Sequence, residues 1–254
     1  MEQQETYLKL IKWLRTAWWK LPESDELLPL IMATCSPEEA NLLTGFPFES
    51  TSLETLADKT NIAPPVLQEK LDALAQRGLV FRTKKGAALR YKLNDSFLIF
   101  YRSAFWSGAT DERTKNIATH VNPYFYDGFF EQYDLTHLKG LRVLPAQDMM
   151  DDIGQVVPYE EVVKVLDSAT YFAVSNCPCR HRKNIDDNYA NCQYTLKDGS
   201  IEVCLHFNRL GEYTVENNMG REITRDEAHE ILNQCAEAGL VHGISNQQNG
   251  PDTI

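Results

Sequence analysis

The sequence lacks any run of apolar residues that approaches the roughly 18 of a membrane-spanning helix. Its opening residues, Met1 to Glu5, are polar and acidic, whereas a secretory signal begins with basic residues and continues with apolar ones. It also lacks an oxyanion-loop motif, a glycine-rich phosphate loop and a paired-carboxylate signature, which argues against an enzyme that acts alone. We therefore expect a cytoplasmic protein without a membrane span.

Basic residues are in the minority. The chain has 25 Lys and Arg against 36 Asp and Glu, a net charge of −11 with an isoelectric point near 5.0. This balance disfavours a protein that binds nucleic acid over its whole surface. The length of 254 residues and the hydrophobic content of 43% are enough for two modest domains with packed cores.

A close series of start and stop signals predicts a winged helix-turn-helix. Thr51-Ser52-Leu53-Glu54 has the pattern of a capping box and opens a helix through Lys59. Pro64-Pro65 opens a second helix that runs to Arg77 and stops at Gly78. Alternating apolar residues then predict two strands, 79–83 and 89–93, that form a β-hairpin. Helix, turn, helix and hairpin in this order are typical of a winged helix.

Other helices and one strand are predicted by the same local signals. Apolar residues at helical spacing predict a first helix over 7–20, and Ser36-Pro37-Glu38-Glu39 opens another. Pro158 opens a helix ahead of a short buried strand, 170–174. A final helix begins at Thr224 and ends at Gly239.

The predicted fold class is α+β and mainly helical, with an N-terminal winged helix-turn-helix followed by a small cysteine-rich metal-binding α/β module. We expect residues 1–105 to form the N-terminal helices and the winged helix. Residues 106–155 form an aromatic-rich connecting segment, in which Phe125 and Phe129 lack clean periodicity and indicate a domain-packing surface. Residues 156–254 form the four-cysteine domain with its C-terminal helix.

The charges of the predicted winged helix favour a partner-docking role over DNA binding. Residues 51–95 hold eight Lys and Arg against five Asp and Glu, a local charge of +3, so the rest of the chain carries −14. The hairpin has basic residues that could touch phosphates, namely Arg82, Lys84, Lys85, Arg90 and Lys92. The second helix, however, begins with the apolar residues 63–67, and Glu69 and Asp72 have the wrong sign for a phosphate backbone. DNA binding therefore stays the second interpretation.

Four of the six cysteines follow the spacing C-x-C-x12-C-x11-C; they are Cys177, Cys179, Cys192 and Cys204. Such a set can fold four thiolates around one centre, and thiolates suit both zinc and iron–sulfur clusters. Arg180 and its basic neighbours would offset the negative charge of the ligands. The spacing predicts a four-cysteine metal site but does not identify the metal. It has neither the paired knuckles of zinc sites nor the repeated C-x2-C of bacterial ferredoxins.

Two histidines and two cysteines have other interpretations. His181 and His206 lie near enough in sequence to replace a ligand, although histidines in such places more often donate hydrogen bonds to the ligands or face solvent. Cys35 stands alone before a helix, and Cys235 lies on the apolar stripe of the last helix. Core packing is the expected role of both cysteines.

Several motifs resemble a family of iron–sulfur proteins of anaerobes, the ferredoxin-domain or 4Fe–4S-binding proteins with an N-terminal winged helix. The motifs are Cys177-Pro178-Cys179-Arg180-His181, Cys192, Glu202-Val203-Cys204-Leu205-His206-Phe207, and the tail from Gly220 to His242. The resemblance implies that the four cysteines, with Arg180, bind one cluster, 4Fe–4S first and zinc as the alternative. In the family, a cysteine-dense ferredoxin module follows the tail. This sequence has none, so we expect it to be the front part of a longer redox protein.

Three functions follow from these features. The first is an electron-transfer or redox-complex subunit whose winged helix docks a redox protein partner or further subunits. The second is a transcription regulator that senses metal or redox state and binds DNA through its winged helix. The third is a scaffold stabilised by zinc.

Overall fold

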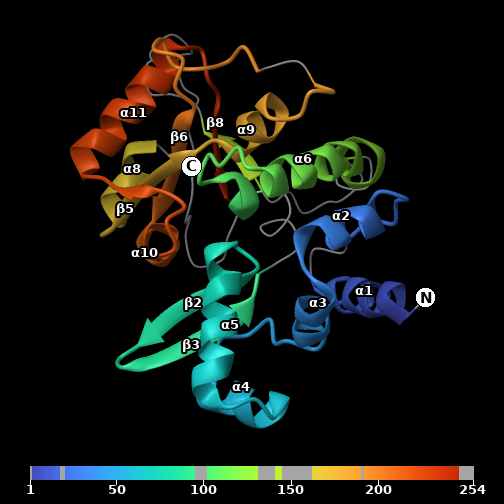
Figure 1. The fold of residues 1–254 in the computed structure, drawn as a ribbon. Helices are drawn as coiled ribbons and strands as arrows, with labels where there is room; N and C mark the ends of the chain where they lie inside the picture. The colour runs from blue at the N-terminus through green and yellow to red at the C-terminus, as the bar shows by residue number, and fades with distance from the viewer. Residues whose placement is uncertain are drawn as a thin grey trace. The chain divides into compact units, whose positions relative to one another are not determined.

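The computed structural model describes residues 2–17, 21–94, 102–130, 141–144, 162–189 and 192–245 (Figure 1). The chain has an α+β fold and divides into two compact units. Unit 1 consists of Met1–Phe105, Ala109–Leu135 and Arg182–Ala190, and unit 2 of Trp106–Gly108, Thr136–His181 and Asn191–Ile254. Neither unit is a single continuous stretch of sequence.

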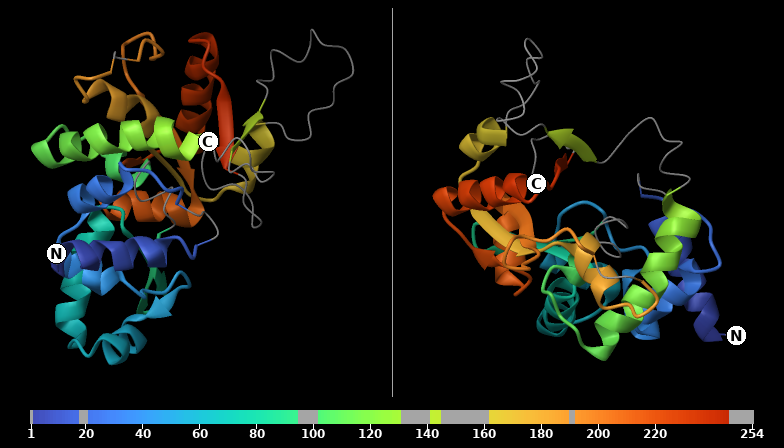
Figure 2. Two further views of the ribbon diagram at one scale, coloured as in Figure 1. Left: turned by 90° about the vertical axis from the view of Figure 1, so that its right-hand side faces the viewer. Right: turned by 90° about the horizontal axis from the view of Figure 1, so that it is seen from above.

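Unit 1 combines helices with one small antiparallel sheet. Its elements are α1 (Glu2–Leu14), α2 (Leu27–Thr34), α3 (Pro37–Leu43), β1 (Thr51–Ser52), α4 (Leu53–Thr60), α5 (Pro64–Gln76), β2 (Val80–Lys85), β3 (Ala88–Leu93), the 3-10 helix η2 (Ser103–Phe105), α6 (Glu112–Tyr124) and the π-helix η3 (Phe125–Phe129). The strand order is β1-β3-β2, and the hairpin pairs Val80 with Leu93 through to Lys85 with Ala88. Figure 2 shows the same elements from two further sides.

The two helices and the hairpin expected between residues 51 and 93 are present. The apolar positions predicted for the inner face of α5, Leu67, Leu71 and Leu74, are almost completely buried. They belong to one hydrophobic core with Val80 and Tyr91 of the hairpin. Burial of the α5 face against the sheet is the main source of stability here, because isolated helices of this length are marginal in water.

Helix α5 ends in a Schellman motif centred on Gly78. The Leu79 amide donates to the carbonyl of Leu74 (3.0 Å), and the Gly78 amide donates to that of Ala75 (3.0 Å). Gly78 adopts the left-handed conformation with φ +79°, as the sequence predicts for a helix stop. Its carbonyl accepts a hydrogen bond from Ser103 Oγ at 3.1 Å, which joins η2 to the end of α5.

Several helix boundaries differ from the sequence prediction, among them the start of α1, which is Glu2 rather than residue 7. Helix α1 ends at Leu14 rather than at residue 20, because the Thr16 and Ala17 amides donate to carbonyls three residues earlier and tighten the last turn. Helix α4 is capped by Ser52, whose hydroxyl accepts from the Thr55 amide, and not by Thr51. Thr51 of β1 instead pairs with Tyr91 of β3, so its backbone belongs to the sheet. The capping box predicted at Thr51 is therefore wrong by one residue.

The aromatic residues after α6 lie on a π-helix. Phe129 is buried, whereas Tyr126 and Phe130 are among the exposed large hydrophobic side chains. The Arg182 guanidinium lies 5.0 Å from the centre of the Phe125 ring, and the Lys183 ammonium lies 5.3 Å from that of Tyr126. These contacts lie within unit 1 and hold the last residues of helix α9 (Pro178–Asn184) against it.

Unit 2 contains short strands and helices that surround a second core. Its other elements are β4 (Leu141–Leu144), α8 (Val162–Ser168), β5 (Phe172–Asn176), β6 (Glu202–Phe207), α10 (Asn208–Glu216), β7 (Arg221–Glu222), α11 (Arg225–Glu237) and β8 (His242–Ser245). One sheet has the order β6-β5-β7, and the pair β4-β8 forms another. The helix start predicted at Pro158 lies outside the described residues. Within the described part of the chain, no helix is long and apolar enough to cross a membrane.

We predict that Gly78 and Gly239, which both end a helix in the left-handed conformation, differ in how well they tolerate a side chain. Gly78→Ala should lower the free energy of unfolding by about 2–4 kcal/mol, because the new Cβ would lie 2.3 Å from Ser103 Oγ in an already strained conformation. Gly239 ends α11 in a similar motif with φ +71°, and its Cβ would meet no described atom within 4 Å. Gly239→Ala should cost only about 1 kcal/mol. Urea denaturation followed by circular dichroism measures both, and equal losses would contradict the steric explanation.

Candidate metal centre

The register between β5 and β6 places one predicted ligand. Ser175 lies directly opposite Cys204, and Ala173 lies opposite His206. Side chains directly opposite each other share a face, and successive residues alternate between faces. Cys204 therefore lies on the same face of the sheet as Ser175 and His206, whereas Val174 and Leu205 belong to the apolar core on the other face.

The first predicted ligand lies where β5 ends and α9 begins. The Cys177 amide donates to the carbonyl of Ile201 at 2.7 Å, which continues the β5–β6 pairing beyond a bulge at Ser175. The Cys177 carbonyl accepts from the amide of His181 at 2.9 Å, and this bond closes the first turn of α9. Pro178 is the first residue of that helix, where its fixed φ and missing donor cost nothing. Cys177 is thus held by backbone bonds on both sides.

The face that carries Cys204 is lined by a buried polar pair and a tryptophan. Ser175 Oγ and His206 Nε2 are 2.7 Å apart, and both residues are almost completely buried. Trp106 packs its ring edgewise on His206 with the ring centres 4.5 Å apart. The Asn176 amide donates to the Trp106 carbonyl at 3.1 Å, which fixes Trp106 beside the end of β5. This arrangement excludes water from the sheet behind Cys204.

Arg180 lies within electrostatic reach of three predicted ligands, Cys177, Cys179 and Cys192. Burial lowers the pKa of its guanidinium, but the thiols of Cys177, Cys192 and Cys179 together raise it above the ordinary value. The Arg180 guanidinium also forms a hydrogen bond with Cys177. A hydrogen bond with Cys179 and then burial raise the pKa of the Cys177 thiol, and the Cys204 thiol raises it further. The structure thus brings the four cysteines and Arg180 into one region of unit 2.

The four thiols act electrostatically on one another or on Arg180, but they do not form a ligand group in the described part of the chain. Among the described residues, no three His, Cys, Asp or Glu side chains are grouped so that they could hold a metal ion. Cys179 is exposed, Cys177 and Cys192 are partly exposed, and Cys204 is buried. The donor chemistry nevertheless fits a thiolate-bound metal, since four soft sulfur donors and one cation share the region. Metal sites of this kind often assemble only when the metal binds, because ligands on loops are not held in place beforehand.

Cys35, Cys235, His181 and His206 are all buried. Cys35 belongs to the core of unit 1 and Cys235 to that of unit 2, as the sequence predicts. Burial raises the pKa of Cys35 to about 12 and that of Cys235 to about 11, and Arg180 counteracts the second shift. Cys235 therefore lies within electrostatic reach of Arg180, which its place on a helical stripe did not indicate. His181 and His206 are both buried rather than solvated.

Sequence reasoning missed two residues of this region. Trp106 and Ser175 have no metal-ligating chemistry, and neither belongs to a recognisable motif. Trp106 reaches His206 across about 100 positions of sequence, and only the fold reveals such a contact. For Ser175, the alternation of strand residues could have indicated that it shares a face with Cys177, two positions later.

Comparison with protein-family models, with curated proteins and with solved structures gave no match to this chain. The interpretation of the centre therefore depends on its own residues.

We predict a graded reactivity of the thiols in the metal-free chain. Alkylation requires an accessible thiolate, so iodoacetamide at pH 8 should modify Cys179 first. A pKa of about 12 leaves only about one Cys35 in ten thousand as thiolate at that pH, so Cys35 should react last, with Cys235 close to it. Mass spectrometry of peptides taken at successive times gives the order. Labelling of Cys35 as fast as Cys179 would contradict the burial described here.

Proposed function

We propose that Cys177, Cys179, Cys192 and Cys204 hold one iron–sulfur cluster, 4Fe–4S first, in an electron-transfer or redox-complex subunit. The observation that supports this proposal is electrostatic contact of Arg180 with Cys177, Cys179 and Cys192, and of Cys177 with Cys204, although these cysteines come from a strand end, a helix, a loop and a neighbouring strand. The resemblance of the motifs to iron–sulfur proteins of anaerobes favours iron over zinc.

Each residue of the centre would have a distinct role. When bound, the cluster supplies one-electron oxidation and reduction. Arg180 places positive charge beside the ligands, which favours the more negative, reduced state. Cys179 is the exposed member of the four, so we expect a redox protein to approach from its side. Trp106 and His206 keep the inner side dry, which lowers the local dielectric around Cys204.

We also propose that residues 51–93 form a winged helix that docks a partner. The order β1-α4-α5-β2-β3 and the sheet order β1-β3-β2 support it. Basic side chains of the hairpin are engaged within the unit. Arg82 forms an ion pair with Asp72 (3.2 Å), Arg90 donates to the Ser50 carbonyl (2.5 Å), and Lys92 lies over Phe81. Asp72 thus neutralises Arg82, while Lys84 and Lys85 at the tip stay exposed.

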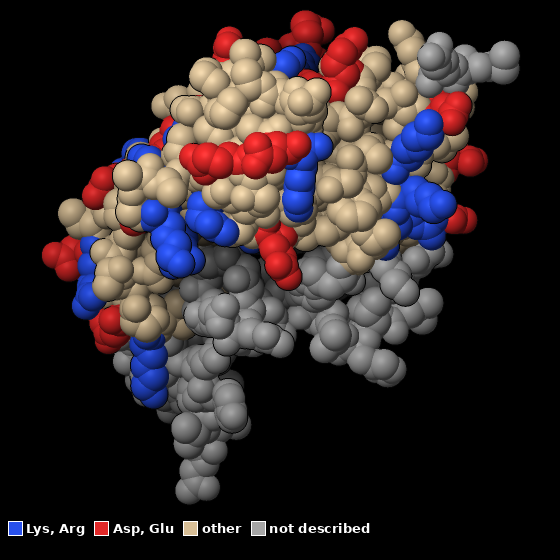
Figure 3. All heavy atoms as spheres, turned by 90° about the horizontal axis from the view of Figure 1, so that it is seen from below, with Lys and Arg blue, Asp and Glu red and all other residues tan. Residues whose placement is uncertain are grey.

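Figure 3 views the molecule from the side of α4 and the β2–β3 hairpin. Lys and Arg side chains form separate groups there, with Asp, Glu and uncharged residues between them. DNA-binding surfaces instead concentrate basic residues along one continuous path. The distribution of charge thus supports a protein partner.

Anaerobic purification followed by iron, sulfide and zinc analysis tests the proposed cluster. We expect about four iron and four sulfide per chain. Changing Cys177, Cys192 or Cys204 to alanine should remove most of the iron and the visible absorption, whereas Cys35→Ala should retain both. One zinc per chain with no iron and no visible absorption would contradict the iron–sulfur proposal and favour the zinc-stabilised scaffold.

The second candidate is a metal-sensing or redox-sensing regulator, which the exposed Lys84 and Lys85 at the hairpin tip favour. It requires salt-dependent binding to duplex DNA that the double variant Lys84→Ala, Lys85→Ala weakens for all sequences. We expect no binding at physiological salt. Fluorescence anisotropy with labelled duplexes measures it. Tight binding that changes when the metal is removed would overturn the docking role.

A further inference from the structure

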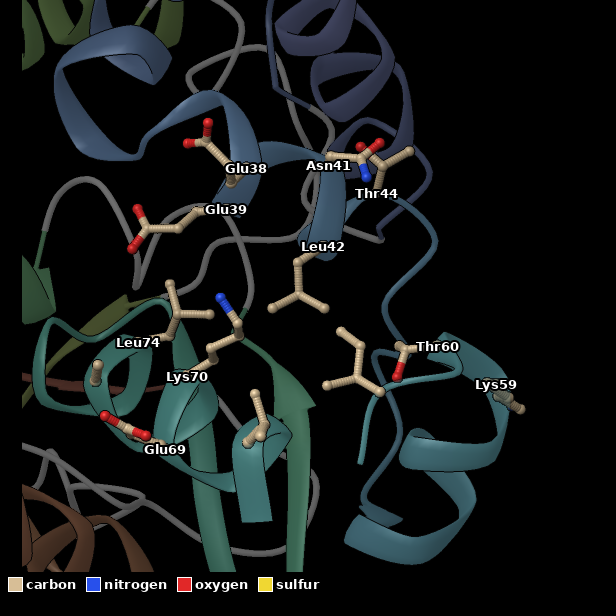
Figure 4. Close-up of a pocket in the computed structure, with 13 residues that line it drawn as sticks. Glu38, Glu39, Asn41, Leu42, Thr44, Lys59, Thr60, Glu69, Lys70 and Leu74 are labelled. Atoms are coloured by element: carbon tan, nitrogen blue, oxygen red, sulfur yellow. The ribbon is translucent and has the colours of Figure 1, made fainter. Parts of the chain in front are cut away.

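Unit 1 contains a groove that plays no part in the candidate metal centre. The groove has a volume of about 670 Å³ and is bounded by α3, the end of α4 and the outer face of α5 (Figure 4). In a DNA-binding winged helix, the outer face of the second helix would enter the major groove of the duplex. Here that face is one wall of a hollow on the protein, with α3 as the opposite wall.

The middle of the groove is apolar. Leu42 of α3 points into it in Figure 4, and Ile62 and Val66 line it from the other side. Leu42 and Ile62 pack on the core of unit 1 but stay partly exposed. Val66 is 48% exposed and is one of the large hydrophobic side chains that folding does not cover. Apolar surface in a concave site with polar edges is typical of binding sites.

One end of the groove is acidic. Figure 4 shows the carboxylates of Glu38, Glu39 and Glu69 at the same end, with the Lys70 side chain between them. Glu39 is neutralised by an ion pair with Arg77. The backbone amide of Glu38, then a hydrogen bond with Ser36, and then the charge of Lys70 lower the pKa of the Glu38 carboxyl.

Glu69 is different from the other two carboxylates. No described residue forms an ion pair or hydrogen bond with its side chain, and the residue is exposed. The acidic end therefore retains a carboxylate that has no counterion among the residues that the structure describes.

We infer that this groove binds a peptide segment of another protein that presents a Lys or Arg beside a large apolar residue. The cation would pair with Glu69, and the apolar side chain would cover Val66 and Leu42. Val66 and Glu69 are three residues apart on α5, which is about 4.5 Å along the helix axis. The two anchors of the peptide therefore lie within one helical turn or two extended residues of each other. Nucleic acid fits poorly, because its phosphates would face the carboxylates.

This inference deepens the docking role proposed for residues 51–93 and does not depend on which metal the cysteines hold. The peptide-binding inference and the iron–sulfur proposal can fail separately. Substitutions in the groove should leave the iron content unchanged, and a chain without iron can still bind peptide.

Panning a library of displayed 12-residue peptides against the intact chain tests the inference. We expect enriched peptides to place Lys or Arg within four positions of Leu, Ile or Phe. Fluorescein-labelled synthetic copies should bind about tenfold more weakly to Glu69→Lys and to Val66→Ser. Asp58→Lys repeats the charge reversal on the exposed face of α4, outside the groove, and Leu8→Ser removes an exposed apolar side chain from α1. Both controls should bind like the parent chain.

Three results would overturn the inference. Panning could enrich no common sequence, or only acidic peptides. The enriched peptides could bind Glu69→Lys and Val66→Ser as tightly as the controls. Sedimentation could reveal a dimer that Val66→Ser dissociates, in which case a second copy of the chain occupies the groove.

Discussion

In unit 2, the pairing of Ser175 with Cys204 determines which face of the sheet can form the candidate centre. Because side chains alternate along a strand, a slip of one residue would turn Cys204 into the apolar core and Leu205 out of it. The apolar side chains of Phe172, Val174 and Phe207 oppose that slip, since each would lose its place in the core. Packing of the apolar face of the sheet thus fixes Cys204 on the opposite face.

The local parts of the fold were predictable, and the long-range parts were not. The Ser36 capping box forms with both of its hydrogen bonds, and Gly78 ends α5 at the expected place. Such features depend on residues a few positions apart, so the sequence contains the whole signal. The cap of α4 was predicted one residue too early, because Thr51 and Ser52 carry equivalent hydroxyls and only the pairing of Thr51 in β1 separates them.

In the candidate centre too, local features were predictable and long-range contacts were not. Spacing and residue type selected the four cysteines, and their role as ligands stays a prediction. Spacing could not indicate that Cys235 also lies within reach of Arg180, since its position on the stripe of α11 predicts only burial. Nor could it place Trp106 on His206, because that contact depends on how distant segments meet.

The positive charge of Arg180 affects the stability of the centre with and without a metal. Its guanidinium is partly buried, and nearby negative charge offsets the free energy that such a cation loses when water is removed from it. The thiols that act on it are weak acceptors when protonated, whereas thiolates bound to a metal carry full negative charge. Arg180 is thus better compensated in a metal-bound centre than in a cluster of neutral cysteines. Four thiolates around one zinc ion or around a 4Fe–4S cluster both leave a net negative charge. Arg180 would stabilise either bound metal and does not select between the two, and the proposal of iron rests on the motifs around the cysteines.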